Sequence, residues 1–258
     1  MKTKNIEDVG RIFYGIAITG IGVLHFIFKG FRGLITAIQP EKPETISVII
    51  YIFGLYLIIS GILIVLGRKL KTTSIILAYV FILFLLFGHL PRRLVDGPQY
   101  LGNWTNALKL SSFIGGAFLV SATSTEKITN NFISKLAGLA PYGKYFFCIM
   151  LIVFGIDHFV YVDFVSGLVP KWIPFPIFWS YFTGVALLGA GLSILINFKL
   201  KTIFRLAAIM LFIWLVTIHL VLAIKYPHWN DGENITACFQ CLAFTGMALL
   251  ISASAYRK

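Results

Sequence analysis

Long apolar runs alternate along the chain with short polar segments, and this alternation is the main structural signal of the sequence. A helix needs about 20 predominantly apolar residues to cross the hydrocarbon core of a bilayer. Eight runs approach that length, at 11–29, 46–66, 73–91, 105–122, 143–162, 176–197, 202–224 and 235–254. The pattern predicts an all-α membrane protein with eight transmembrane helices.

The positions of the prolines agree with this division, because proline lacks the backbone N–H that the interior of a helix uses. No proline lies in the middle of a run, and most of them, such as Pro91, fall in the connecting segments. Pro141 lies just before the fifth run, where the start of a helix accommodates it. No run is therefore expected to be broken by proline.

The composition supports a membrane protein over a nucleic-acid-binding protein. The 258 residues are 58% hydrophobic and only 12% charged, with a mean hydropathy of +0.88, whereas a soluble domain is about 25% charged. The net charge of +12 comes from basic residues in the short segments between runs, where such residues set membrane topology. No segment resembles an RNA- or DNA-binding module, so the lipid bilayer is the expected partner and nucleic acid is not.

The two halves of the sequence repeat each other at a nearly constant offset. The matching segments are GVLHF (22–26) with GIDHF (155–159), YIFGLYLIISG (51–61) with YFTGVALLGAG (181–191), and NWTNALKLSSFIGGAFLVSA (103–122) with NITACFQCLAFTGMALLISA (234–253). We predict two tandem four-helix repeats, at 1–122 and 142–258, with a cytoplasmic joint at 123–141. Because each repeat has an even number of helices, both repeats point the same way and are parallel.

Lysine and arginine are distributed unevenly between the two ends of the predicted helices. If the N-terminus is cytoplasmic, most of the 22 lysines and arginines lie on the cytoplasmic side, including Lys2, Arg257 and Lys258 near the chain ends. Cytoplasmic loops of membrane proteins carry an excess of these residues. The expected location is the inner (cytoplasmic) membrane, with both termini in the cytoplasm.

Four histidines interrupt the apolar runs at equivalent places in the two repeats. His25 and His158 lie near the outward ends of the first and fifth runs, and His89 and His219 lie near the outward ends of the third and seventh runs. Ionisable residues within membrane spans usually face the interior of the protein and mark a functional site. We therefore expect the four histidines to share a role in binding a ligand.

Three chemistries are compatible with these histidines. They could ligate a haem iron or another metal, hydrogen-bond a quinone and exchange protons with it, or form polar locks between helices. The sequence contains neither H-E-x-x-H nor C-x-x-C-H. A quinone site or a structural lock is therefore favoured over haem, and no metal site is expected.

Asp157 belongs to the candidate site but occurs in only one repeat. The matching position in the first repeat is Leu24. Neighbouring residues of a helix point about 100° apart, so Asp157 and His158 cannot share one partner. We expect Asp157 to pair either with an arginine of the other repeat or with Lys109, and to tune one of the two sites.

Two further pairs of polar residues invite a functional interpretation. Cys238 and Cys241 form a C-x-x-C pair near the start of the last run, which is either a redox dithiol or small apolar filler, and filler is favoured. Asn103 and Asn234 begin sequences that fit the N-glycosylation pattern. Their matched places before the fourth and eighth runs are better explained by N-capping of the helices.

The second repeat resembles the DoxX-like family of small membrane proteins. The resemblance rests on GIDHFVYVDFVSGLVPKWIPFPIFWSYFTGVALLGAGLSIL at 155–195: a helix that ends in His-Phe, a loop with Leu-Val-Pro-x-Trp-Ile-Pro, and a glycine-rich helix that begins with Tyr-Phe-Thr-Gly. The family takes its name from a subunit linked to quinone-reducing thiosulfate oxidation, and other relatives are tied to thiol and oxidative-stress chemistry. The resemblance implies a four-helix membrane unit and a link to quinone redox chemistry.

These observations lead to one functional prediction and one alternative. The predicted function is the binding of a quinone or a similar hydrophobic redox ligand near the outer face, as part of a membrane redox system with a partner subunit. His25, His89, His158, His219 and Asp157 would contact that ligand. The alternative is a non-enzymatic scaffold or a small-molecule transporter in which the histidines are structural.

Overall fold

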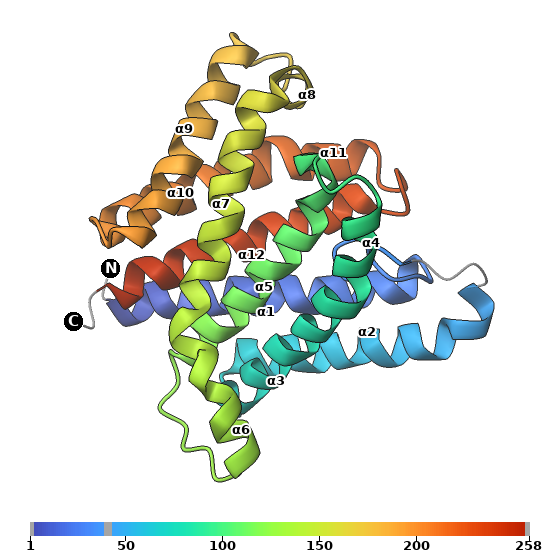
Figure 1. Ribbon diagram of the computed structural model, residues 1–258, viewed down its shortest axis with the longest axis vertical. Coiled ribbons are helices and arrows are strands. Elements are labelled where there is room, and N and C mark those ends of the chain that lie inside the picture. The colour runs from blue at the N-terminus through green and yellow to red at the C-terminus, as the bar shows by residue number, and fades with distance from the viewer. Residues whose placement is uncertain (1–2, 39–42, 256–258) are drawn as a thin grey trace.

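The computed structural model describes residues 3–38 and 43–255, so Lys2, Arg257 and Lys258 lie outside the described residues. The described chain is helical and contains no β-strand (Figure 1). Seven helical segments in it are long and apolar enough to cross a membrane: Thr3–Ile27, Ser47–Leu66, Leu70–Val95, Asn131–Val160, Pro176–Leu195, Leu200–Lys225 and Glu233–Ser254. The predicted all-α, multi-pass membrane class is confirmed.

The fourth predicted run forms a shorter helix than the others. Helix α5, Thr105–Ser121, has 17 residues and follows a 3₁₀ turn, η2, at Leu101–Trp104. At 1.5 Å per residue α5 is about 26 Å long, slightly less than the roughly 30 Å of bilayer hydrocarbon. Among the described residues, seven segments rather than the expected eight therefore have the length of a span.

The third and seventh predicted spans each contain a π-helical turn that the apolar pattern did not predict. The third consists of α3 (Leu70–Leu83), η1 (Phe84–His89) and α4 (Leu90–Val95), and the seventh of α10 (Leu200–Trp214), η4 (Leu215–His219) and α11 (Leu220–Lys225). Pro91, which we expected in a connecting segment, lies in the first turn of α4. That expectation was wrong because the π-helical turn lets the helix continue, and the first turn of α4 needs no N–H from Pro91.

The segment between the two halves is partly helical. It contains α6 (Asn131–Leu136) and a 3₁₀ helix, η3 (Ala137–Tyr142). The side chain of Asn130 accepts hydrogen bonds from the first N–H groups of α6. Pro141 lies in η3 directly before α7, which confirms its predicted place at a helix start.

The long helices pack in one closed ring. In chain order the remaining long helices are α1 (Thr3–Ile27), α2 (Pro43–Leu66), α7 (Gly143–Val160), α9 (Pro176–Leu195) and α12 (Glu233–Ser254). Contacts run from α1 through α2, α3, α5, α7, α9 and α10 to α12, which returns to α1, while α5 and α12 also meet across the middle. The first helix of each half therefore packs against the last helix of the other half.

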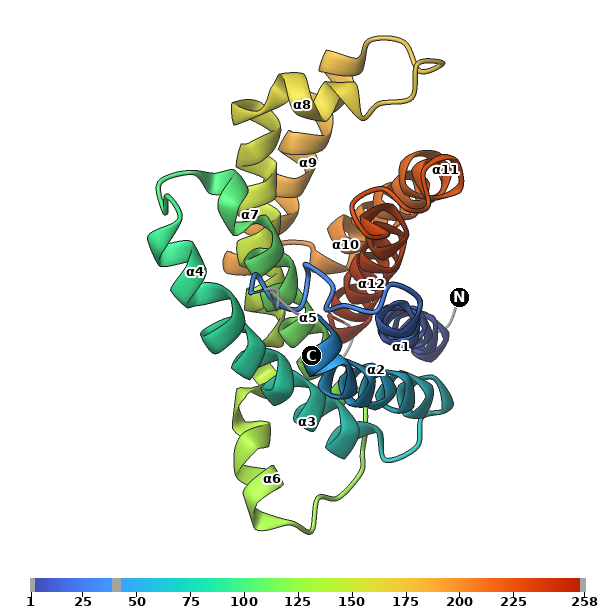
Figure 2. The ribbon, with the colours of Figure 1, turned by 90° about the vertical axis from the view of Figure 1, so that its right-hand side faces the viewer.

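The two outer pairs of helices cross each other. In Figure 1, α1 and α2 run across the view while α7 and α9 run up it. In Figure 2, α1 and α2 are seen nearly end-on and α7 and α9 still run up the view. Helices α5 and α12 lie between the two pairs and join them.

Glycine residues allow the close contacts between the halves, because glycine lets two helix backbones approach each other. A Cβ atom at Gly246 of α12 would lie only 2.6 Å from the carbonyl oxygen of Gly10 in α1. A Cβ atom at Gly143 of α7 would lie 2.8 Å from the carbonyl oxygen of Gly115 in α5. Gly10 matches Gly143 and Gly246 matches Gly115 in the sequence repeat, so the two junctions are built alike.

A chain of buried aromatic rings fills the centre of the ring of helices. Phe113 of α5 and Phe244 of α12 lie edge to face with centroids 6.0 Å apart. Tyr14 lies against Phe113 and Phe147 lies against Phe244, at 5.9 and 6.1 Å. The Tyr14 hydroxyl donates a hydrogen bond to the Phe113 carbonyl, so the buried phenol is satisfied in an apolar core.

The segments that follow α1 and α7 differ sharply. After α1, Leu34 and Ile35 are completely buried, although they belong to no helix. After α7, α8 (Val162–Gly167) and the following chain project from the top of the molecule (Figure 2). Trp172 and Phe175 there are 72% and 76% exposed. The first segment is folded into the protein and the second is left outside it.

Candidate functional site

Each of the four predicted histidines lies near the C-terminal end of its helical segment, α1, η1, α7 or η4; we call this part of each half its histidine end. His25 and His158 lie two residues before the ends of α1 and α7. His89 and His219 are the last residues of the π-helical turns η1 and η4. His25 and His89 are completely buried, whereas His158 and His219 are half-buried.

His25 is enclosed by aromatic rings. Its Nδ1 donates to the Ile21 carbonyl of its own helix at 2.8 Å. The edges of Phe31 and Phe53 meet its ring at centroid distances of 5.9 and 5.4 Å, and Phe84 packs against both phenylalanines. The Nε2 atom is buried without a hydrogen-bond partner.

His89 ties η1 to the buried segment after α1. Its Nε2 donates to the Leu34 carbonyl at 3.0 Å, and its Nδ1 is buried without a partner. A π-helical turn disturbs the regular hydrogen bonds of a helix and frequently marks a functional site. Here the Gly88 carbonyl accepts from Ala37 N–H at 3.1 Å and from the Thr36 hydroxyl at 3.3 Å. The turn therefore anchors the segment that covers His25.

Arg32 is a component of this region that sequence reasoning missed. The sequence analysis gave it no role, yet it is just 4% exposed. Its guanidinium donates to the carbonyls of Gly30 and Asp231 and lies 5.1 Å from the centroid of the Phe28 ring. Burial lowers the pKa of Arg32 from its ordinary value, while the carboxylates of Asp231 and Glu233 oppose that shift.

The bond from Arg32 to Asp231 connects the two halves, because Asp231 lies in the turn before α12. The sequence does contain a signal for the burial of this segment, namely the mainly apolar residues GLITAI at 33–38 that follow Arg32. An apolar stretch in a loop indicates a segment that folds back into the protein.

His158 has a more open surrounding than its counterpart His25. Its Nδ1 donates to the Phe154 carbonyl at 2.7 Å, as the matching atom of His25 does in α1. Its ring stacks on Trp214 of α10, with centroids 6.0 Å apart and an interplanar angle of 17°. Trp214 occupies the position that matches Phe84, but the position of Phe53 is taken by the smaller Thr183. His158 therefore keeps one flat aromatic neighbour and loses the enclosing rings.

Asp157 lies half-buried beside His158, and its Oδ1 atom is buried without a hydrogen-bond partner. Within the described residues it forms no ion pair, so the predicted pairing with an arginine or with Lys109 is wrong. Arg92 pairs instead with Asp96, four residues along its own helix. Lys109 lies instead near Glu233 of α12.

His219 belongs to a different polar group from His158. Lys109 of α5 is close enough to His219 to interact with it electrostatically. Lys109 also lies near Glu233 of α12, so this group joins η4, α5 and α12. The histidines are thus not one cluster: His25 and His89 meet the segment after α1, His158 faces Trp214, and His219 lies near Lys109.

In the described part of the chain, no group of three or more His, Cys, Asp or Glu residues could hold a metal ion. Cys148, Cys238 and Cys241 are free, and the buried Cys241 donates from Sγ to the Leu211 carbonyl. Cys241 is therefore a buried packing residue with a satisfied thiol.

The expected N-capping by Asn103 and Asn234 is wrong. The cap positions of α5 and α12 are Trp104 and Gly232, and neither helix has a side-chain cap. The amide of Asn103 donates to the carbonyls of Asp96 and Gly97, and that of Asn234 donates to the Tyr226 carbonyl. The two asparagines have one shared role, which is to hold the preceding loop against the start of the helix.

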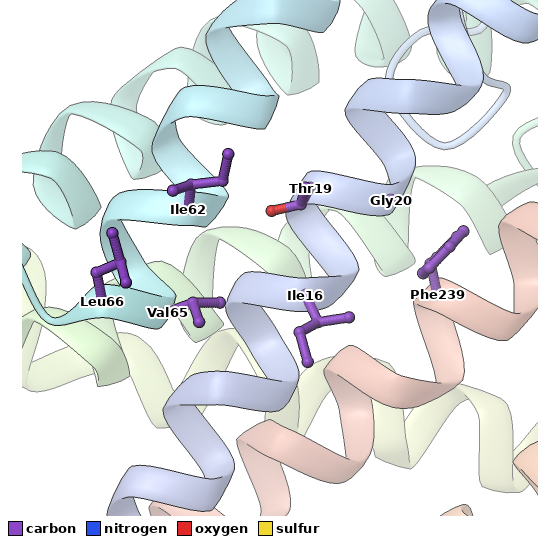
Figure 3. Close-up of a pocket in the computed structure, with 7 residues that line it drawn as sticks. All are labelled: Ile16, Thr19, Gly20, Ile62, Val65, Leu66 and Phe239. Atoms are coloured by element: carbon purple, nitrogen blue, oxygen red, sulfur yellow. The ribbon is translucent and has the colours of Figure 1, made fainter.

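Two apolar cavities near the surface are lined mainly by residues of the first half. One, of about 330 Å³, is lined by residues of α1, α2 and α12, with α2 on one side of α1 and Phe239 on the other (Figure 3). The hydroxyl of Thr19 in this cavity already donates to the Gly15 carbonyl. The other, of about 420 Å³, lies between η1 and the buried segment and includes Phe31 and Phe84. None of the four histidines lines either cavity.

Comparison with known protein families matches the second half of the chain. A family model described as a domain of unknown function (DUF8561) matches residues 147–249, from the first turns of α7 into α12. No curated protein matches the chain. No solved structure matches it.

Proposed function

We propose that this chain is a DoxX-like protein of the inner membrane, with eight spans in two tandem four-helix repeats and both termini in the cytoplasm. The matched Gly10–Gly246 and Gly143–Gly115 contacts support the duplication. So do the matched π-helical turns η1 and η4 and the matched Nδ1 hydrogen bonds of His25 and His158. The family model that covers residues 147–249 alone supports a unit of about one half.

The proposed function is the binding of a quinone or a similar hydrophobic aromatic redox ligand at the histidine end of the second half. The observation that carries it is the half-buried His158 ring stacked on Trp214. Flat aromatic ligands bind between apolar walls with a few polar groups that fix their orientation, and offset stacking on an aromatic ring adds to their affinity. The unpartnered Oδ1 of Asp157 supplies a second polar group near this position.

The first half supports the proposal by contrast. There the chain's own Phe31 and Phe53 occupy the space around His25, and Arg32 holds the covering segment in place. At the corresponding place in the second half, Thr183 replaces Phe53 and the segment after α7 stands outside the protein. The proposed ligand takes the place in the second half that Phe31 takes in the first.

A direct test is to purify the protein in a mild detergent and assay retained quinone in a solvent extract. We expect about one quinone per chain in the wild type and little in His158→Phe, which keeps a ring but removes its nitrogens. His25→Phe is the matched control and should retain quinone, because His25 is closed to a ligand. An absorption spectrum of the same sample, reduced and oxidised, tests for haem.

Absence of quinone from a folded wild-type sample, both as purified and after incubation with a short-chain quinone, would contradict the proposal. The second candidate function is then a non-enzymatic scaffold that presents its exposed aromatic segment to a redox partner subunit. The hydrogen bond from His89 to the Leu34 carbonyl favours a structural role for the histidines of the first half, because it joins η1 to the segment after α1.

A further inference from the structure

The hydrogen bonds of the histidines determine what kind of ligand they can accept. A backbone carbonyl can only accept a hydrogen bond, so the ring nitrogen that meets it must carry the proton. In His25 and His158 this nitrogen is Nδ1, and in His89 it is Nε2. The other nitrogen of each neutral ring is then an acceptor.

The acidic neighbour Asp157 does not engage the His158 ring. Asp157 is next to His158 but points about 100° away around the helix, and it makes no hydrogen bond to the ring among the described contacts.

We infer that the His158 site selects a ligand that donates a hydrogen bond, and that it therefore binds a hydroquinone in preference to the corresponding quinone. This inference rests on the proposed function. The free Nε2 of His158 can accept from a hydroquinone O–H, while its Nδ1–H is already used on the Phe154 carbonyl. A quinone has only carbonyl oxygens, which are acceptors, so it could form no hydrogen bond with the Nε2 of His158, which is also an acceptor.

The experiment measures the affinities of three probes for the protein in lipid nanodiscs, by equilibrium dialysis under exclusion of oxygen. The probes are tetramethylhydroquinone, tetramethylbenzoquinone and the dimethyl ether of the hydroquinone, which has the same ring but no O–H. Empty nanodiscs correct for partition into lipid. We expect the hydroquinone to bind roughly tenfold more tightly than either other probe, since one net hydrogen bond is worth about that factor.

Variants test whether the preference for hydroquinone over quinone depends on the ring nitrogens of His158. His158→Phe should bind all three probes about equally, and His25→Phe should keep the wild-type preference as the matched control. His158→Gln, whose side-chain amide can donate, should bind the quinone more tightly than His158→Phe does. Equal affinities of hydroquinone and quinone for the wild type, or a preference that survives in His158→Phe, would overturn the inference but leave the proposed function standing. Failure of every probe to bind above empty nanodiscs would overturn both.

Discussion

Single polar side chains of the same type have different surroundings in the two halves. His25 and His158 occupy matched positions and make the same hydrogen bond to their own helix, yet one is enclosed by Phe31 and Phe53 and the other stacks on Trp214. The difference arises from neighbours, chiefly Thr183 in place of Phe53. At the scale of residues, matched polar groups therefore differ in what surrounds them and not in their place on the helix.

Asp157 gives a prediction at this scale. Its unpartnered buried oxygen loses hydration without regaining a hydrogen bond, which costs free energy. Asp157→Leu, which introduces the residue of the matching position, should raise the free energy of unfolding by about 1–2 kcal/mol. Thermal unfolding followed by circular dichroism in detergent measures this change.

The reciprocal substitution Leu24→Asp is the matched control. Leu24 is 2% exposed, and a carboxylate placed there without a partner should lower the free energy of unfolding by about 3–5 kcal/mol. If Asp157→Leu were as destabilising as Leu24→Asp, Asp157 would have a structural partner, contrary to the contacts described above.

At the scale of elements, glycine contacts and π-helical turns decide how the helices meet. The pairs Gly10–Gly246 and Gly143–Gly115 bring α1 against α12 and α7 against α5. The π-helical turn η1 lets the Gly88 carbonyl bind the segment after α1. Both devices act between elements that are far apart in the sequence, so each junction depends on a small number of backbone positions.

Substitution of Gly246 tests the α1–α12 junction. A Cβ atom there would meet the Gly10 carbonyl oxygen at 2.6 Å, so Gly246→Leu should force the helices apart and lower the free energy of unfolding by about 3 kcal/mol or more. Gly189→Ala in α9 is the control, because a Cβ atom there meets nothing within 4 Å. It should raise stability by about 0.5–1 kcal/mol, the usual gain from replacing glycine within a helix. Equal effects of the two substitutions would show that the junction is not tightly packed.

At the scale of the whole molecule, the two halves complete each other. Helix α1 packs against α12 and α5 packs against α7, and Arg32 of the first half binds the Asp231 carbonyl of the second. Neither half contains a closed ring of its own, so most of the apolar surface at these junctions is buried only when both are present.

This interdependence predicts the behaviour of a chain divided in the segment between Thr123 and Asn130, which is irregular and comes before α6. The two fragments should copurify as a one-to-one complex when they are expressed together, and each should aggregate when it is expressed alone. Size-exclusion chromatography in detergent, with a tag on one fragment, measures this. Stable monomeric fragments that do not associate would contradict the ring arrangement.

Several features of the fold and the site follow from local sequence alone. The apolar runs predicted the helical membrane class, since a span must satisfy its backbone within one segment. The repeat located the four histidines at equivalent helix ends. The pairing of Asp157 and the caps by Asn103 and Asn234 were predicted wrongly, because each depends on which carbonyl or charge is brought near in space.

The sequence by itself determined that this chain is an all-helical membrane protein with polar groups gathered near one end of its helices, because hydropathy and helix length act within each segment. The tertiary structure decided that Phe31–Thr36 closes one histidine, that Arg32 joins the halves, and that His158 is left beside Trp214. These outcomes depend on contacts between segments distant in sequence and on the size of single neighbours such as Phe53 and Thr183. The hydrophobic periodicity of a single helix does not predict such contacts.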